Sequence, residues 1–145
     1  MDKIDREILR VLVDDGRCAY SELAERVHLS GNAVAERVRR MVGNGTILGF
    51  RAILDPAAFG RTLAAQIDVK LRPTTSAVEF EKAIRELPQV TSATLMTGSY
   101  DYAVRVECVD RAELVEVTET IRNQAGALET YSRVILREVS VRTVG

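Results

Sequence analysis

The residues best suited to binding chemistry in this chain are arginines gathered between positions 26 and 51. This stretch contains a single acid, Glu36, and five arginines, which are Arg26, Arg37, Arg39, Arg40 and Arg51. Guanidinium groups bind phosphate oxygens and guanine edges, and a local basic patch can do so even though the whole chain of 145 residues has a net charge of −1. The pattern predicts a surface for double-stranded DNA; the alternative is that these charges only solvate a helix face.

Three short helices are expected to position these arginines. The first has a cap at Asp2, apolar residues at helical spacing behind it, and an end at Gly16. A second short helix follows Ser21, and His28-Leu29 turns the chain toward a third. In a helix-turn-helix the second helix of such a pair enters the major groove of DNA. The first fifty residues therefore predict an N-terminal helix-turn-helix, possessing a wing if the next segment forms a hairpin.

The third helix determines which side chains are offered outward. Ser30 can cap this helix, and Val34, Val38 and Met41 form its buried stripe at about 100° per residue. Arg37 then lies on the flank of the helix. The side chains that point away from the core are those of Asn32, Glu36, Arg39 and Arg40.

Each outward side chain matches a feature of duplex DNA. Asn32 can pair with adenine, Glu36 can accept from cytosine, and the arginines can meet phosphate or guanine. The start of the helix, with Ser30, offers donors to phosphate. Two structural alternatives stay open: Glu36 can pair with arginines on the surface, and Arg37 can pair with an acid of the first helix. The predicted DNA-binding residues are Ser30, Asn32, Glu36, Arg37, Arg39 and Arg40.

The segment after the third helix changes period. Residues 47–54 are expected to form a small hairpin or a hinge strand, and Asp55-Pro56 marks the domain boundary. The predicted organisation is a DNA-binding domain over residues 1–50, a hinge strand or linker over 51–62, and a second domain over 63–145.

The second domain follows the order strand, helix, strand, strand, helix, strand. Ser76 and Glu79 form a capping box for one helix, while Asp110 opens the other, which Gly126 ends. Two β-α-β units predict an α+β, ferredoxin-like βαββαβ domain with both helices on one face of an antiparallel sheet. The other face is expected to include apolar positions that a lone domain would leave bare, which predicts a homodimer. The expected strands are residues 63–71, 90–96, 102–108 and 128 to about 141.

The composition argues against other classes of protein. Cys18 and Cys108 are isolated and His28 is the only histidine, so neither a metal site nor a cofactor is expected. No catalytic residue is predicted, and Arg72 lies in a loop without the glycine cradle that an acyl-phosphate hydrolase would need. The other alternative is a module that docks protein instead of DNA. With no long apolar run and no secretory leader, the protein is expected in the cytoplasm, without membrane contact.

Several short motifs follow one another in a specific order along nearly the whole chain. The second half contains Pro88-x-Val90, Gly98-x-Tyr100-Asp101-Tyr102 and Asp110. The first half contains Asp2-x-x-Asp5-x-x-Ile8-Leu9, Asp15-Gly16-Arg17, Glu22-Leu23-Ala24, Leu29-Ser30, Arg37-Val38-Arg39-Arg40-Met41 and Gly45-x-Ile47-x-Gly49-Phe50. Together they resemble the Lrp/AsnC (leucine-responsive, or feast/famine) family of transcriptional regulators. Gly31 and Glu36 depart from the family pattern, which puts the DNA sequence that is read in doubt.

The resemblance implies a transcriptional regulator whose homodimers assemble further, often to octamers, and whose second domain binds an amino acid between subunits. A glycine turn can offer backbone donors to the carboxylate of such a ligand, and Asp101 can meet its ammonium group. The alternative is an ordinary hairpin in which Asp101 bonds the backbone. A two-fold protein also implies a roughly palindromic operator. The implied effector-binding residues are Gly98, Ser99, Tyr100, Asp101, Thr130 and Ser132.

Overall fold

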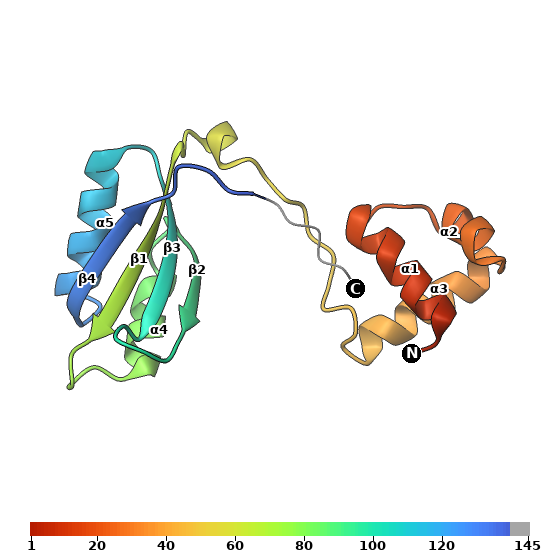
Figure 1. Ribbon diagram of the computed structural model, residues 1–145, viewed down its shortest axis with the longest axis horizontal. Helices are drawn as coiled ribbons and strands as arrows, with labels where there is room; N and C mark the ends of the chain where they lie inside the picture. The colour runs from red at the N-terminus through yellow and green to blue at the C-terminus, as the bar shows by residue number, and fades with distance from the viewer. Residues whose placement is uncertain (140–145) are drawn as a thin grey trace. The chain divides into compact units, whose positions relative to one another are not determined.

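A computed structural model of the chain describes residues 1–139 and divides them into two compact units (Figure 1). The second unit, from Leu54 onward, holds a four-stranded sheet and two helices. Within residues 1–139, no helix is long and apolar enough to cross a membrane. The first unit, Met1–Ile53, contains the helices α1 (Lys3–Asp14), α2 (Tyr20–Val27) and α3 (Gly31–Gly43).

Side-chain caps explain where α1 and α3 begin. Asp2 and Asp5 form a capping box, in which the Asp5 N–H donates to Asp2 at 2.8 Å and the Asp2 N–H donates to Asp5 at 3.1 Å. The Ser30 hydroxyl accepts from the Ala33 N–H at 3.2 Å. Both predicted caps are therefore confirmed, and each satisfies backbone donors that the first turn of a helix leaves free.

The start of α2 differs from the prediction. The helix begins at Tyr20, and the preceding Ala19 makes no side-chain cap. The prediction that this helix follows Ser21 was wrong, because Ser21 lies inside its first turn. At the other end, His28 takes a left-handed conformation with φ of 53° and turns the chain toward α3, as expected.

The linker contains no strand. Residues 44–55 form no strand in the described chain, so neither the hairpin nor the hinge strand predicted over residues 47–54 is seen there. Instead a short 3-10 helix, η1 (Pro56–Phe59), follows Asp55, whose side chain accepts from the Ala57 N–H at 2.9 Å. Alternating residue types alone do not make a strand when no neighbouring strand offers hydrogen bonds.

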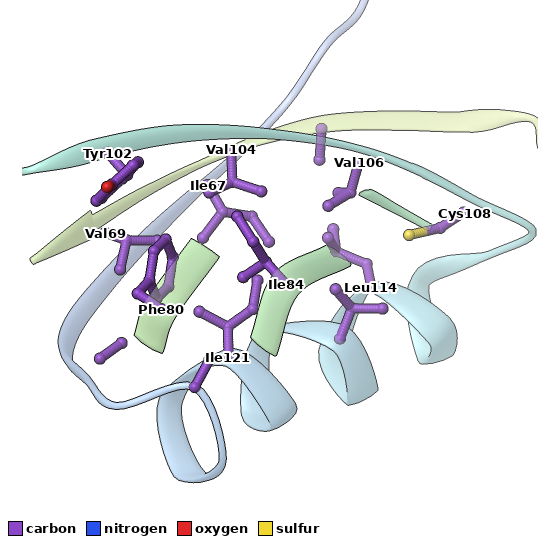
Figure 2. Packing of buried hydrophobic residues seen from close by; sticks show 14 residues of the cluster. Ile67, Val69, Phe80, Ile84, Tyr102, Val104, Val106, Cys108, Leu114 and Ile121 are labelled. Atoms are coloured by element: carbon purple, nitrogen blue, oxygen red, sulfur yellow. The ribbon is translucent and has the colours of Figure 1, made fainter. Parts of the chain in front are cut away.

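The second unit is an antiparallel sheet with strand order β2-β3-β1-β4 and both helices on one face (Figure 2). This arrangement confirms the predicted α+β, ferredoxin-like fold. The final strand is shorter than predicted, because residues 135–139 are not strand, and the predicted end near position 141 lies outside the described residues. The elements are β1 (Leu63–Leu71), α4 (Ala77–Arg85), β2 (Val90–Leu95), β3 (Tyr102–Cys108), α5 (Arg111–Asn123) and β4 (Ala127–Val134).

The core of this unit lies between the sheet and the two helices, where apolar residues alternate along β1 and β3 (Figure 2). Phe80 from α4 packs against Tyr102 from β3 with ring centroids 4.7 Å apart. The Tyr102 hydroxyl donates to Glu81 at 2.8 Å. Burial and the neighbouring Glu81 raise the pKa of Tyr102 to about 12, so this phenol remains a hydrogen-bond donor at neutral pH.

The opposite face of the sheet carries several charged and polar side chains. Asp68 is buried there and accepts from Gln66 at 2.7 Å and from Arg133 at 2.6 Å. Arg105 donates to the buried Glu107 at 3.0 Å on the same face. Tyr131 pairs with Asp68 on this same face and is 56% exposed, so the expected apolar positions are present there among charged and polar side chains.

Gly126 connects α5 to β4 and should tolerate no side chain. Its φ is +83°, and a Cβ atom would lie 2.3 Å from the Thr75 Oγ1. We expect Gly126→Ala to lower the free energy of unfolding by about 1–3 kcal/mol, because the change adds both backbone strain and a clash. Denaturant unfolding followed by circular dichroism measures this loss.

Two further variants separate the clash from the strain. Adding Thr75→Ala to Gly126→Ala should restore only the part of the stability that the clash removes. Gly43→Ala is the matched control, since a Cβ atom at this last residue of α3 would have no neighbour within 4 Å. Equal losses for Gly43→Ala and Gly126→Ala would contradict the explanation.

Candidate functional site

The buried side of α3, which packs into the core of the first unit, is as predicted. Val34, Val38 and Met41 are buried in the core of the first unit. Asn32, Glu36 and Arg39 are exposed. Glu36 forms no ion pair with the neighbouring arginines within residues 1–139, so the surface-pair alternative is not supported, and Arg39 donates to the Ala35 carbonyl at 3.3 Å. The helix therefore offers an amide, a carboxylate and a guanidinium on its outward side.

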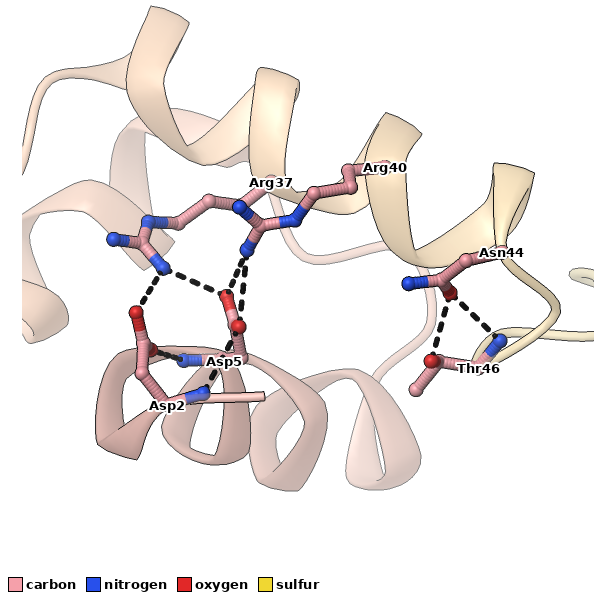
Figure 3. Close-up of polar contacts among 6 residues, drawn as sticks. All are labelled: Asp2, Asp5, Arg37, Arg40, Asn44 and Thr46. Atoms are coloured by element: carbon pink, nitrogen blue, oxygen red, sulfur yellow. Dashed lines mark hydrogen bonds and ion pairs between the residues drawn. The ribbon is translucent and has the colours of Figure 1, made fainter.

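Asp5 of α1 and the N-cap residue Asp2 hold the other two arginines (Figure 3). The Arg37 guanidinium donates to Asp2 at 2.7 Å and to Asp5 at 2.8 Å. Arg40 donates to both oxygens of Asp5 at 3.0 Å. The alternative that Arg37 pairs with an acid of the first helix is thus confirmed, and Arg37 has a structural role that the predicted DNA contact did not include.

The electrostatics of this cluster follow from its geometry. Burial acts to raise the pKa of Asp5, but hydrogen bonds from Arg37 and from the Asp2 N–H outweigh it and leave the pKa below its ordinary value of 3.8. The Asp5 N–H and then Arg37 lower the pKa of Asp2. Both acids in turn raise the pKa of Arg37. The cluster consequently favours its fully charged form.

Acid should weaken the first unit through these carboxylates. Because their pKa values are lowered on folding, the stability they contribute is complete above their ordinary value and is lost as the pH falls below it. We expect the melting temperature of the first unit to fall as the pH drops below about 4. Asp5→Asn should melt lower at neutral pH and lose less on acidification, which thermal melts over a pH series will show. A variant with the same acid-induced loss as the wild type would exclude Asp5 as the cause.

Sequence reasoning predicted Asp2 as a helix cap and left open which acid of the first helix pairs with Arg37. That pairing depends on contacts between positions more than thirty residues apart. One signal was present in the sequence: acids three residues apart at the start of one helix match arginines three residues apart in another.

At the far end of α3, the Asn44 side chain accepts from the Thr46 N–H and hydroxyl, closing the turn (Figure 3).

The predicted effector turn is tied to the end of β1. The Asp101 N–H donates to the Val69 carbonyl at 2.8 Å, and the Asp101 carboxylate accepts from the Leu71 N–H at 2.7 Å. Gly98 has φ of 122°, a conformation that favours glycine. One carboxylate oxygen of Asp101 is thus engaged by the backbone of β1, outside its own hairpin.

The two predicted hydroxyls on β4 contact α5. Thr130 accepts from Arg122 at 2.8 Å, and Ser132 lies 3.3 Å from the Thr118 hydroxyl. Thr130 pairs with Val69, so this residue and the turn lie next to the same end of β1. The structure brings the turn and Thr130 toward one end of the sheet, and both already have intramolecular partners.

A separate hollow of about 400 Å³ lies between α4 and β2. Its lining combines apolar Ile84 and Leu95 with charged Glu81 and Arg85. None of the six predicted effector residues lines it. The described residues include no group of His, Cys, Asp and Glu able to hold a metal ion.

A three-helix unit with an outward third helix, joined to a ferredoxin-like unit, defines the class of DNA-binding regulators with a separate ligand-binding domain. The model of the AsnC-type helix-turn-helix domain matches residues 1–42, and that of the Lrp/AsnC ligand binding domain matches residues 64–144. The chain belongs to the Lrp/AsnC family of transcriptional regulators, as its motifs suggested.

Individual relatives agree. The proline dehydrogenase transcriptional activator of Rhizobium radiobacter is 33% identical, over 96% of this chain and 91% of its own. The leucine-responsive regulatory protein of Escherichia coli K12 is 32% identical, over 96% and 87%. A transcriptional regulator of Neisseria meningitidis, solved as an L-Met complex, superposes with a TM-score of 0.90 at 30% identity, over 99% of this chain and 94% of the other. This chain is accordingly a DNA-binding transcriptional regulator with a ligand-binding domain, a family role that does not involve catalysis.

Proposed function

We propose that this regulator reads operator DNA with α3 and that an amino acid, bound by the second unit, changes its assembly or its affinity for DNA. The observation that carries the proposal is a set of outward side chains on a helix whose other side is packed in the core. Asn32, Glu36 and Arg39 are exposed, opposite the buried stripe of α3. Operator DNA is in the cytoplasm of a bacterium or archaeon, and we place the protein there.

The proposed set of DNA-contacting residues is smaller than the set predicted from the sequence. Ser30, Asn32, Glu36 and Arg39 stay in the set, and Arg40 stays because its side chain is 57% exposed. Arg37 is withdrawn, because its side chain is 24% exposed and bridges two carboxylates. Base edges would be read by Asn32 and Glu36, and phosphates would be met by the arginines.

The amino-acid effector is supported by the matched ligand-binding domain and by the L-Met complex of the meningococcal relative. We keep Gly98, Ser99, Tyr100, Asp101, Thr130 and Ser132 as the proposed contacts. The turn offers backbone donors to a carboxylate, and the second oxygen of Asp101 makes no hydrogen bond within residues 1–139. The hydroxyls of β4 would add weaker polar contacts.

We also propose a homodimer that assembles further, to an octamer. Support comes from large apolar side chains that a single chain leaves bare in the linker, where Leu48 is 96% and Ile53 is 94% exposed. Covering such side chains by another copy removes apolar surface from water. Sedimentation with and without amino acids would measure the assembly, and a dilute folded monomer would refute it.

A gel shift on the promoter upstream of the protein's own gene tests the function. The promoter duplex should be bound more tightly than a scrambled duplex of equal length. At least one of the twenty amino acids should change the shift. Equal binding to both duplexes would refute sequence-specific reading. Thermal shift against the same amino acids then tests the effector separately, and silence from all of them would refute an amino-acid ligand.

A further inference from the structure

The buried Asp5 carboxylate accepts more hydrogen bonds than it needs to leave neither oxygen unsatisfied. Its Oδ1 accepts from Arg37 at 2.8 Å and from Arg40 at 3.0 Å. Its Oδ2 accepts from Arg40 at 3.0 Å and from the Asp2 N–H at 3.1 Å. If Arg40 leaves, each oxygen still keeps one donor. The departure of Arg40 therefore leaves no buried acceptor unsatisfied, which is the costly outcome when a buried ion pair opens.

The two arginines are held very differently. Arg37 bridges Asp2 and Asp5, whereas Arg40 contacts Asp5 alone. At about 100° per residue, Arg40 lies about 80° around α3 from Asn32, and Arg37 lies about 140° around. Arg40 thus borders the outward side of the helix and Arg37 lies nearer its buried stripe, although both guanidinium groups reach Asp5 (Figure 3).

We propose that Asp5 serves as an intramolecular stand-in for a DNA phosphate: it holds Arg40 in the free protein and releases it to a backbone phosphate when duplex DNA binds. Arg37 stays on Asp2 and Asp5 and acts as a positioning residue for α3. The proposal rests on the proposed reading of DNA by α3. Carboxylate and phosphate both offer a guanidinium a pair of oxygens, so Arg40 would exchange one anionic acceptor for another with similar hydrogen bonds. Arg40 is also ordered before DNA arrives, which reduces the entropy lost on binding.

The exchange predicts different behaviour for substitutions at the two arginines. Full-length wild type, Arg40→Gln, Arg40→Lys and Arg37→Gln would be titrated with a labelled random-sequence duplex over a salt series, and melted without DNA. Arg40→Gln should reduce the slope of log K against log salt by about 0.9, the contribution of one phosphate contact, and should melt close to the wild type. Arg40→Lys should keep the slope. Arg37→Gln should melt several degrees lower and keep the slope below its melting temperature.

A spectroscopic measurement follows the exchange directly. When duplex is added to 15N-labelled protein, the side-chain Nε–H signal of Arg40 should shift and that of Arg37 should not. A wild-type slope for Arg40→Gln, a melting loss equal to that of Arg37→Gln, or an unmoved Arg40 signal would each overturn the exchange while α3 still reads DNA. A wild-type chain that binds no duplex would instead refute the DNA-reading function, and the exchange with it.

Discussion

Val38→Asp should unfold the first unit and weaken operator binding by roughly 100-fold or more, while the second unit stays folded. Val38 is 2% exposed at the centre of the buried side of α3. A buried carboxylate with no partner costs about 3–5 kcal/mol, and a unit of this size has only a few kcal/mol of stability to lose. The two cores share no residue, so the damage should not spread.

Two measurements and one matched variant check this expectation. An NMR fingerprint should lose the signals of the first unit and keep those around Phe80 and Tyr102. Val13→Asp places the same charge at a residue of α1 that is 67% exposed, and it should fold and bind DNA like the wild type. If Val38→Asp binds the operator normally, α3 is not seated as described.

Local signals made most of the fold predictable. The Ser76-x-x-Glu79 pattern predicted a capping box, and Ser76 and Glu79 do exchange side-chain to backbone hydrogen bonds. The strict alternation from Leu63 to Leu71 predicted β1 with its observed bounds. Such features depend on neighbours along the chain, which a sequence displays directly.

The errors arose where the deciding partner is distant in sequence. The segment after α3 has suitable residues for a strand, but no neighbouring strand pairs with it in the described chain. The polar side chains of the opposite sheet face were readable in the sequence, because Gln66, Asp68 and Lys70 alternate with the apolar residues of β1. That Tyr131 of β4 lies beside Asp68 on this face depends on strand register, which the sequence does not display.

The candidate site shows the same division. Periodicity correctly separated the buried stripe of α3 from its exposed residues. It could not show that Arg37 binds Asp2 and Asp5, because a guanidinium on the flank of a helix can face solvent or a neighbouring helix equally well. For Asp101, residue type allowed either a ligand contact or a backbone hydrogen bond, and only the fold brings the Leu71 N–H within 2.7 Å.

Asn32→Ala and Arg39→Ala should weaken DNA binding in two distinguishable ways. Asn32 lies near the start of α3, where a recognition helix reaches base edges, so its loss should cost about 1–3 kcal/mol on the operator and almost nothing on scrambled DNA. That cost corresponds to roughly 5-fold to 150-fold in affinity. Arg39 is the proposed phosphate contact, so its loss should weaken binding to both duplexes alike and reduce the salt slope by about 0.9.

Anisotropy titrations of both duplexes over a salt series measure these effects. Arg10→Ala is the matched control, because this exposed arginine of α1 pairs with Glu7 and lies outside the proposed contacts. It should bind like the wild type. If Asn32→Ala weakens both duplexes equally, then Asn32 does not read a base, and specificity must come from Glu36 or from the shape of the DNA. If Arg39→Ala leaves the salt slope unchanged, its guanidinium makes no phosphate contact and stays on the Ala35 carbonyl.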